Sequence, residues 1–503
     1  MSAADDPLRE DLQAIAGGTG LSMLGRIVNG ALSFFYGVVL ARLLDIHSVG
    51  VMMLALAIIR IAEFVARMGL ELGTLHYVAI LAGKGSIAGV RGTVRSALGL
   101  VVLFGFALTA ILAASAGLMS VRFEMPDLAA VIRILSVSLV PTSMTMILLA
   151  ALLGLKQFGY NTVCERIVLP ATNLVICGAL LLAGFGIVGA SVAYVAAALL
   201  TFPLAARYFG RSAPAAGRVS APIAAGELLR FSAPLVLVII LTQMLFWADI
   251  VMLGLLRSAS EVAVYSAAAR TAFAANMIVA AAGQIFAPTI SHLYHRGDLS
   301  HLEALYKTVG KWMFLATLPA VMLLLLLSAE VLRLFGPAFV AGKTALMILA
   351  VTQLVDAGTG TSSFMLTMSG RTKLMVFNTG VAFVLNVALN ALLVPRFGIE
   401  GAAAATFLAL GTFQLLALIE TRWTLKMHPY SAGYLKPLAA GIAAFACVWA
   451  VKAAIGEMPY VLAIVVYSAA YAVLYFGALF VAGLAKEDEL VLSTIRSKLR
   501  RAS

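Results

Sequence analysis

Fourteen stretches of about 20 consecutive apolar residues recur along this 503-residue chain, and they constrain its fold more than any other feature. Each is long enough to cross the hydrocarbon core of a bilayer as an α-helix. The composition agrees, because 62% of the residues are hydrophobic and only 12% are charged. The sequence therefore predicts an all-α integral membrane protein. The predicted helices span residues 17–41, 49–72, 93–117, 129–153, 160–184, 187–209, 232–254, 262–288, 308–328, 342–368, 373–395, 399–421, 437–456 and 460–484.

The distribution of lysine and arginine predicts the orientation of these helices. With a cytoplasmic N-terminus, most of the 35 Lys and Arg residues fall in cytoplasmic loops and in the basic tail at 486–503. Residues 1–16 are polar and no cleavage site follows a short apolar stretch, so helix one is predicted to be retained. Both termini are therefore expected in the cytoplasm. Basic loops that face anionic membrane lipids also account for the net charge of +12, without a nucleic-acid partner.

The sequence repeats at a spacing of 212 to 213 residues. LARLLDIHSVGVMMLA at 40–55 aligns with LGLLRSASEVAVYSAA at 253–268, and FGIVGA at 185–190 aligns with FGIEGA at 397–402. Each copy holds six predicted helices, and because six is even both copies enter the membrane from the same side. We predict two parallel six-helix bundles related by a pseudo-twofold axis, with an appended C-terminal helix pair.

The predicted domain boundaries follow from this repeat and from the Pro-, Gly-, Ala- and Arg-rich stretch between the bundles. The segments are a cytoplasmic N-terminal segment at 1–16, an N-terminal bundle at 17–210, a cytoplasmic linker at 211–231, a C-terminal bundle at 232–425, appended helices 13 and 14 at 426–485, and a basic cytoplasmic tail at 486–503.

Several short motifs resemble those of the bacterial polysaccharide flippases, which export O-antigen and exopolysaccharide precursors. They are ARLL followed by VG at 41–50, FSAPL at 231–235, LRLFGPAF at 332–339 and the two FGI-x-GA motifs. The superfamily of these proteins also contains the lipid II flippases and the multidrug and toxin extrusion antiporters. The resemblance implies a V-shaped pair of bundles around a central cavity, which opens alternately to each side and carries a polyprenyl-diphosphate-linked sugar outward.

Three charges interrupt the second apolar stretch. Arg60 and Arg67 lie about 20° apart around a helix, with Glu63 about 60° away, so they share one face. Each charge at membrane depth costs roughly 2.5–3.5 kcal/mol on insertion scales, which favours a face directed at a watered cavity. The alternative is structural: Arg67 reaches the headgroups and Arg60 pairs with Glu63. We favour this alternative for Arg67 and the cavity for Arg60.

Two further arginines lie inside predicted helices, Arg26 in helix one and Arg270 in helix eight. Together with Arg60 they form the predicted substrate site. Arginine suits a diphosphate because its planar guanidinium stays charged and binds phosphate oxygens in pairs. An open alternative is that Arg270 pairs with Asp249 of helix seven.

Three acids are candidates for ion coupling or for charge pairing, namely Glu63, Asp249 and Asp356. Either aspartate could bind a coupling cation or a sugar hydroxyl, or neutralise an arginine. No metal site or cofactor is expected. His292 and His295 have no further ligands nearby in sequence, and the three cysteines lack CxxC spacing.

The function predicted from these features is that of a flippase in the bacterial inner membrane. It would move a polyprenyl-diphosphate-linked oligosaccharide to the outer leaflet for lipopolysaccharide O-antigen or exopolysaccharide biosynthesis, with a polysaccharide polymerase or other biosynthesis proteins as candidate partners. The alternative is a cation-coupled multidrug antiporter, whose cavity would favour acids and aromatics over arginine. An enzyme is disfavoured, because the longest outer connection, about 329–341, is too short for a catalytic domain.

Overall fold

The computed structural model describes residues 7–214, 225–456 and 458–481. Side chains before Leu24 are not described. The predicted tail at 486–503 and the middle of the predicted linker lie outside the described residues, as does the start of the N-terminal segment.

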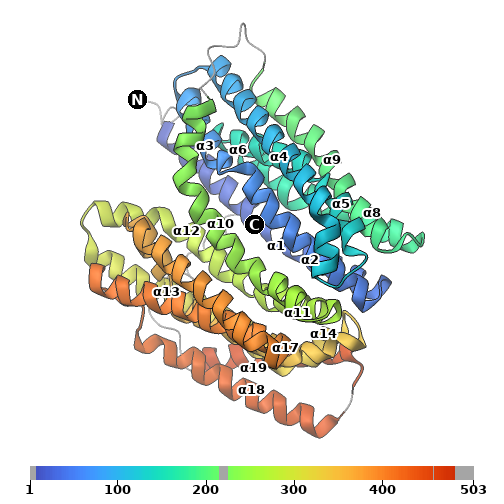
Figure 1. Cartoon of the computed structure of the whole chain (residues 1–503). Coiled ribbons are helices and arrows are strands. Elements are labelled where there is room, and N and C mark those ends of the chain that lie inside the picture. Colours follow the sequence, from blue (N-terminus) through green and yellow to red (C-terminus); the bar gives the residue numbers. More distant parts are fainter. Residues whose placement is uncertain (1–6, 215–224, 457, 482–503) are drawn as a thin grey trace, which may run out of the picture. The chain divides into compact units, whose positions relative to one another are not determined.

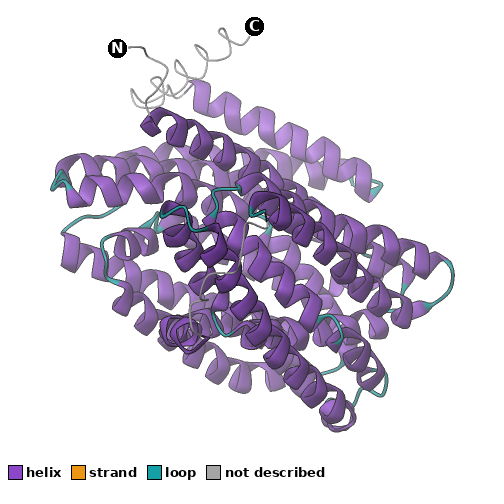
Figure 2. Ribbon diagram, turned by 90° about the horizontal axis from the view of Figure 1, so that it is seen from above, coloured by secondary structure: helices purple, strands orange, loops and turns teal. Residues whose placement is uncertain are grey.

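All regular structure in the described ranges is helical (Figure 2), as the sequence predicts. The chain forms two compact units, one comprising Met1–Ser266 with Asn390–Gly398 and the other Ala267–Leu389 with Ile399–Ser503. The elements of the first unit, several of them labelled in Figure 1, are α1 (Pro7–Leu43), α2 (Ile46–Arg67), α3 (Leu70–Gly83), α4 (Ile87–Arg122), α5 (Leu128–Ser136), α6 (Leu139–Gly154), α7 (Phe158–Asn161), η1 (Thr162–Val168), α8 (Leu169–Leu182), α9 (Gly186–Ser212), α10 (Ala225–Leu256) and the start of α11 (Ala259–Phe273).

The second unit holds the rest of the chain. Its elements are the end of α11, α12 (Asn276–His295), α13 (Leu299–Leu326), α14 (Ser328–Arg333), η2 (Pro337–Gly342), α15 (Lys343–Gly358), α16 (Ser362–Met368), most of α17 (Thr372–Leu425), η3 (Ala432–Tyr434), α18 (Leu435–Ile455) and α19 (Tyr460–Val481).

Ten helices in the described residues are long and apolar enough to cross a membrane, or eleven if the pair α5 and α6, bent by 40°, forms one span. Pro141 lies just after that bend, in the first turn of α6. α17 consists of two helices that meet at Gly398, where the backbone is not helical. Helix α3 lies in a stretch for which the sequence predicts a loop, because at 14 residues it is too short to cross a bilayer.

The two FGI-x-GA motifs adopt related backbone conformations. Gly186 in the first copy has φ of 55° and Gly398 in the second has φ of 57°. Glycine occupies such conformations at little cost because it has no Cβ. In the first unit the motif joins α8 to α9, which pack against each other, and in the second copy it joins the two halves of α17. The shared conformation supports the internal repeat.

Helix α2 lies in the interior of the first unit. In its most apolar 18-residue stretch 72% of the residues are buried, whereas the corresponding share in α4 is 22%. Helix α10 packs closely on it. A Cβ at Gly254 would lie 2.8 Å from the side chain of Leu54, and one at Gly50 would meet the carbonyl oxygen of Ala259. Small residues thus allow the close backbone approach that membrane helices use when no hydrophobic effect drives their association.

In the second unit, polar contacts attach the last two helices to α13. The Tyr475 hydroxyl donates to the carbonyl oxygen of Leu315 at 2.9 Å, and Lys452 Nζ donates to that of Leu326 at 2.7 Å. Lys452 also pairs with Glu330 at 2.8 Å. The pair α18 and α19, which has no counterpart in the first copy, therefore packs as part of this unit.

We predict opposite effects for two glycine substitutions in α17. Gly398→Ala should lower the free energy of unfolding by about 1–2 kcal/mol, because an alanine is strained at positive φ and its Cβ would lie 2.9 Å from Glu261 Oε2. Gly411→Ala, in a helical position with open space, should raise it by about 0.5–1 kcal/mol. Thermal unfolding in one detergent measures both, and equal shifts for the two variants would contradict the prediction.

Candidate functional site

The Glu63 carboxylate lies in the interior of the first unit and is fully buried. It accepts a hydrogen bond from Arg60 Nη1 at 3.0 Å and another from the Tyr194 hydroxyl at 3.1 Å. The i, i+3 spacing on α2 brings Arg60 and Glu63 together. Tyr194 comes from α9, more than 130 residues away, and sequence spacing offers no signal for it. The ion pair between Arg60 and Glu63 that the sequence allows is therefore present.

Arg60 makes a second contact with Tyr194, since its guanidinium lies 5.5 Å from the centre of that ring. Such cation–π contacts gain strength when water is excluded. The Arg60 side chain nevertheless remains 34% exposed, whereas that of Glu63 is buried. Arg60 therefore neutralises the buried carboxylate while part of its own side chain stays accessible.

Arg67 does not share this exposure. It is 5% exposed, its Nε lies 2.5 Å from Glu71 Oε1, and its guanidinium stacks 4.4 Å from the ring centre of Phe64. The expectation that Arg67 reaches the headgroups is wrong, because a carboxylate on the next helix pairs with it inside the unit.

Arg26 lies against the π-helix η1. A Cβ at the neighbouring Gly25 would overlap Thr162, so α1 and η1 approach each other closely at this point. Arg26 interacts electrostatically with Arg166 as a like charge and with Glu165 as an opposite one, and Glu165 also interacts with Arg60. π-Helical turns in membrane and soluble helices often mark functional sites. Glu165 and Arg166, which are neighbours on η1, therefore both lie close enough to Arg26 to interact with it electrostatically.

We call Arg26, Arg60, Glu63, Glu165 and Arg166 the N-terminal charge cluster. Its three guanidinium groups outnumber its two carboxylates. The Nε atoms of Arg26 and Arg166 are buried without a hydrogen-bond acceptor among the described residues. Buried donors of this kind are costly unless an acceptor completes them. The cluster can therefore bind an anion whose oxygens accept from guanidinium groups, as those of a phosphate do.

Asp249 is 4% exposed and accepts hydrogen bonds from neutral groups. The Tyr265 hydroxyl donates at 2.7 Å and Asn390 Nδ2 at 2.8 Å. Asn390 lies in α17, within the short segment that belongs to the first unit. These contacts fix the carboxylate between α10, α11 and α17.

Asp356 has a comparable environment in the second unit. Asn276 Nδ2 donates to one carboxylate oxygen at 2.8 Å, and Gln414 donates to the other. The Thr359 hydroxyl, directly after the end of α15, lies 3.4 Å from Gln414 Oε1. Arg270, the third predicted substrate-binding arginine, lies half-buried near the end of α11 in this unit.

A comparison with known protein families identifies the chain. A family model described as polysaccharide biosynthesis protein matches residues 15–294, more than half of the sequence. The chain belongs to this family. A second model, described as MatE, matches residues 234–392. The family consists of transporters and flippases and not of enzymes.

Two curated relatives from Haloferax volcanii match part of the chain. A probable low-salt glycan biosynthesis flippase, Agl15, is 32% identical over 168 residues, which cover 32% of this chain and 35% of the relative. A probable flippase, AglR, is 26% identical over 175 residues, which cover 34% of this chain and 37% of the relative. The chain thus spans about a third of the length of the curated relatives it matches.

Solved structures share the fold over most of the chain. The lipid II flippase MurJ in an inward closed conformation has a TM-score of 0.72 at 13% identity, covering 92% of this chain and 99% of the other. A multidrug resistance MATE family transporter in an inward-facing conformation has a TM-score of 0.69 at 16% identity, covering 80% of this chain and 98% of the other. The protein is therefore a multi-pass integral membrane protein with the fold of these transporters.

We predict that Arg60→Ala lowers the free energy of unfolding by about 3 kcal/mol, because it leaves a buried carboxylate without its cation. The double variant Arg60→Ala/Glu63→Gln should regain much of this loss, since its amide carries no charge and can still accept from Tyr194. Thermal unfolding in a single detergent compares the two. A double variant no more stable than Arg60→Ala would contradict the assignment of Arg60 as the counter-ion.

Proposed function

We propose that the protein is a flippase that moves a polyprenyl-diphosphate-linked oligosaccharide from the inner to the outer leaflet of the bacterial cytoplasmic membrane. The observation that carries this proposal is the N-terminal charge cluster, in which the buried Nε atoms of Arg26 and Arg166 have no hydrogen-bond acceptor among the described residues. The family and the two flippase relatives support a lipid-linked glycan as the substrate. Lipopolysaccharide O-antigen and exopolysaccharide precursors are the proposed substrates of this class, and polymerases of the same pathway are proposed partners.

In the proposed mechanism, Arg26 and Arg60 bind the diphosphate from the cytoplasmic side and Arg270 receives it as access changes to the outside. Arg166 joins them because it lies beside Arg26. The polyprenyl tail stays in lipid. This mechanism requires the predicted fourteen helices, arranged as two parallel bundles at 17–210 and 232–425 around a central cavity, with both termini in the cytoplasm.

The membrane potential can contribute to the driving force. Moving one elementary charge through 100 mV is worth about 2.3 kcal/mol, so an anionic headgroup leaving a negative interior gains free energy if protein charges do not move oppositely. Asp249, Asp356 and Glu63 are the proposed coupling or charge-partner groups. Asp356 accepts hydrogen bonds from the neutral amides of Asn276 and Gln414, so a proton could reach or leave this carboxylate without breaking an ion pair in either of these contacts.

We predict that Arg26→Ala, Arg60→Ala, Arg166→Ala and Arg270→Ala each weaken binding of a polyprenyl diphosphate by roughly 10- to 100-fold, because each removes a charge-assisted hydrogen bond worth about 1.5–3 kcal/mol. The same variants should restore less surface glycan in cells that lack a polysaccharide flippase. Arg207→Ala on α9, an exposed arginine, is the matched control and should leave both readouts unchanged.

Membrane levels of the variants are compared by immunoblot, and Arg60→Ala/Glu63→Gln tests whether loss of function follows charge or stability. If all four variants bind and export as well as the parent, the assignment of these arginines to the substrate site is wrong.

The alternative function, a cation-coupled multidrug antiporter, rests on the MatE match at 234–392. It would be favoured if the parent protein conferred resistance to cationic dyes and restored no surface glycan.

A further inference from the structure

Helix α1 has two opposite faces from Leu24 onward. Leu24, Ile27 and Phe35 expose more than half of their surface and lie within about 80° of one another around the helix. This apolar face suits contact with lipid. The polar residues of the opposite face, centred roughly 180° away, are Arg26, Asn29, Ser33 and Tyr36. Polar side chains at membrane depth face the interior of a bundle or water, and we call these four residues the polar face of α1.

Contacts with other helices of the first unit locate both ends of the polar face of α1. At one end, Arg26 interacts electrostatically with Arg166 of η1. At the other end, Tyr36 interacts with Tyr194 of α9. Arg26 and Tyr36 are ten residues apart, which is about 15 Å along a helix. The polar face therefore runs along the N-terminal charge cluster, and its side chains between the two ends are neutral.

Asn173 on α8 lies near the level of Tyr194. A Cβ at Gly189 would lie 3.1 Å from Leu180 Cβ, so these two residues lie side by side in the hairpin of α8 and α9. Five residues further from the turn, Tyr194 lies opposite Val175, two positions from Asn173. Val175 is 69% exposed and lies about 160° from Asn173 around α8, so Asn173 lies on the side away from lipid.

The buried atoms that lack hydrogen-bond partners differ in kind at the two levels. Arg26 Nε and Arg166 Nε are donors, whereas Asn173 Oδ1 is an acceptor, and none of the three has a hydrogen-bond partner among the described residues. Phosphate oxygens complete guanidinium donors. An ionised phosphate has no hydrogen to donate to Asn173. A sugar hydroxyl does, because it both donates and accepts.

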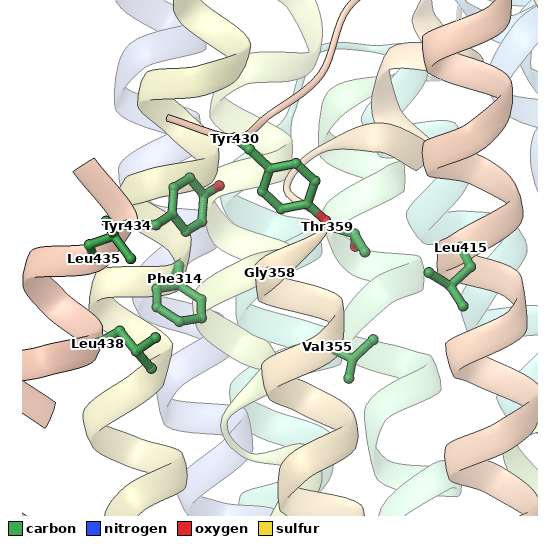
Figure 3. A pocket seen from close by; sticks show the side chains of 9 residues that line it. All are labelled: Phe314, Val355, Gly358, Thr359, Leu415, Tyr430, Tyr434, Leu435 and Leu438. Carbon is green, nitrogen blue, oxygen red and sulfur yellow. The ribbon is translucent and has the colours of Figure 1, made fainter. Parts of the chain in front are cut away.

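A pocket in the second unit has the opposite chemistry (Figure 3). It has a volume of about 340 Å³ and lies where α13, α15, α17 and the start of α18 meet. Phe314 and Leu438 contribute apolar walls beside Gly358. The Thr359 hydroxyl at this pocket already donates to the carbonyl oxygen of Asp356 at 2.9 Å. A sugar would find few hydrogen-bond partners there, so the first unit suits a glycan better.

We propose that Asn29 and Asn173 bind hydroxyls of the sugar residue attached to the diphosphate, while Arg26 and Arg166 bind the phosphates. The inference rests on the proposed flippase function and adds the position of the first sugar to it. Asn29 is partly exposed and follows Arg26 by one helical turn on the same face. The order of groups in the ligand, phosphate and then sugar, matches the order of unsatisfied donors and acceptor from the level of Arg26 to that of Asn173.

The test measures binding by the purified full-length protein in detergent. The ligands are undecaprenyl diphosphate and the same lipid carrying one glucose, galactose or N-acetylglucosamine. The parent should bind at least one sugar-bearing lipid about tenfold more tightly than undecaprenyl diphosphate. Asn29→Leu and Asn173→Leu should each reduce this preference about 3- to 10-fold, because each removes hydrogen bonds to the sugar, and should leave binding of undecaprenyl diphosphate unchanged.

Matched controls lie on the lipid-facing sides of the same helices. Ala31→Leu on α1 and Val175→Leu on α8 alter exposed positions and should bind every ligand as the parent does. Arg26→Ala should weaken binding of all the lipids by a similar factor, because they share the diphosphate. Asn173→Leu should not lower the melting temperature, since it removes a buried acceptor that has no partner among the described residues.

The outcomes separate this inference from the proposed function. If the parent binds undecaprenyl diphosphate and the sugar-bearing lipids equally well, the sugar site is wrong and the flippase proposal stands. An unchanged sugar preference in both asparagine variants would also overturn the sugar site. A fall in the melting temperature of Asn173→Leu would give Asn173 a structural role instead. If the parent binds none of the lipids, the proposed function fails together with this inference.

Discussion

The cost of placing an ionised side chain away from water is the constraint on which this structure depends. Glu63 is fully buried in the most enclosed helix of the first unit. Such a group persists only with a counter-ion and satisfied hydrogen bonds. Arg60 and Tyr194 supply both, which ties α2 to α9 at one point. The same contacts orient the guanidinium of Arg60 and leave part of its side chain exposed.

Asp249 and Asp356 have different hydrogen-bond donors from Glu63, which accepts from an arginine. Asp249 and Asp356 each accept hydrogen bonds from amide or hydroxyl groups, and each joins several helices within its own unit. A hydrogen bond to a charged group contributes about 1.5–3 kcal/mol, so these donors stabilise both carboxylates. Arginines that carry unsatisfied buried donors, Arg26 and Arg166, are found instead beside η1.

The hydrophobic pattern of the sequence predicted the helical class and most of the helix positions correctly, because a backbone in lipid must satisfy its hydrogen bonds within each helix. It missed α3 and the division of single apolar runs into α5 with α6 and into α11 with α12. These breaks depend on local packing, which leaves the average hydropathy unchanged. Arg60 and Glu63 could be paired from their spacing on one helix. The contact of this pair with Tyr194 could not be predicted from the sequence, because it joins α2 to α9, which are distant in sequence.

The sequence by itself determined that this protein is helical and membrane-embedded, that it contains an internal repeat, and that arginines interrupt its apolar runs. Those properties follow from the length, periodicity and identity of residues along one chain. Only the tertiary structure decided that Arg67 turns to Glu71, that Arg26 meets Arg166, and that an apolar pocket forms beside Gly358. Each of these depends on which faces of separate helices pack together, because a side chain's neighbours across a bundle have no fixed spacing in sequence.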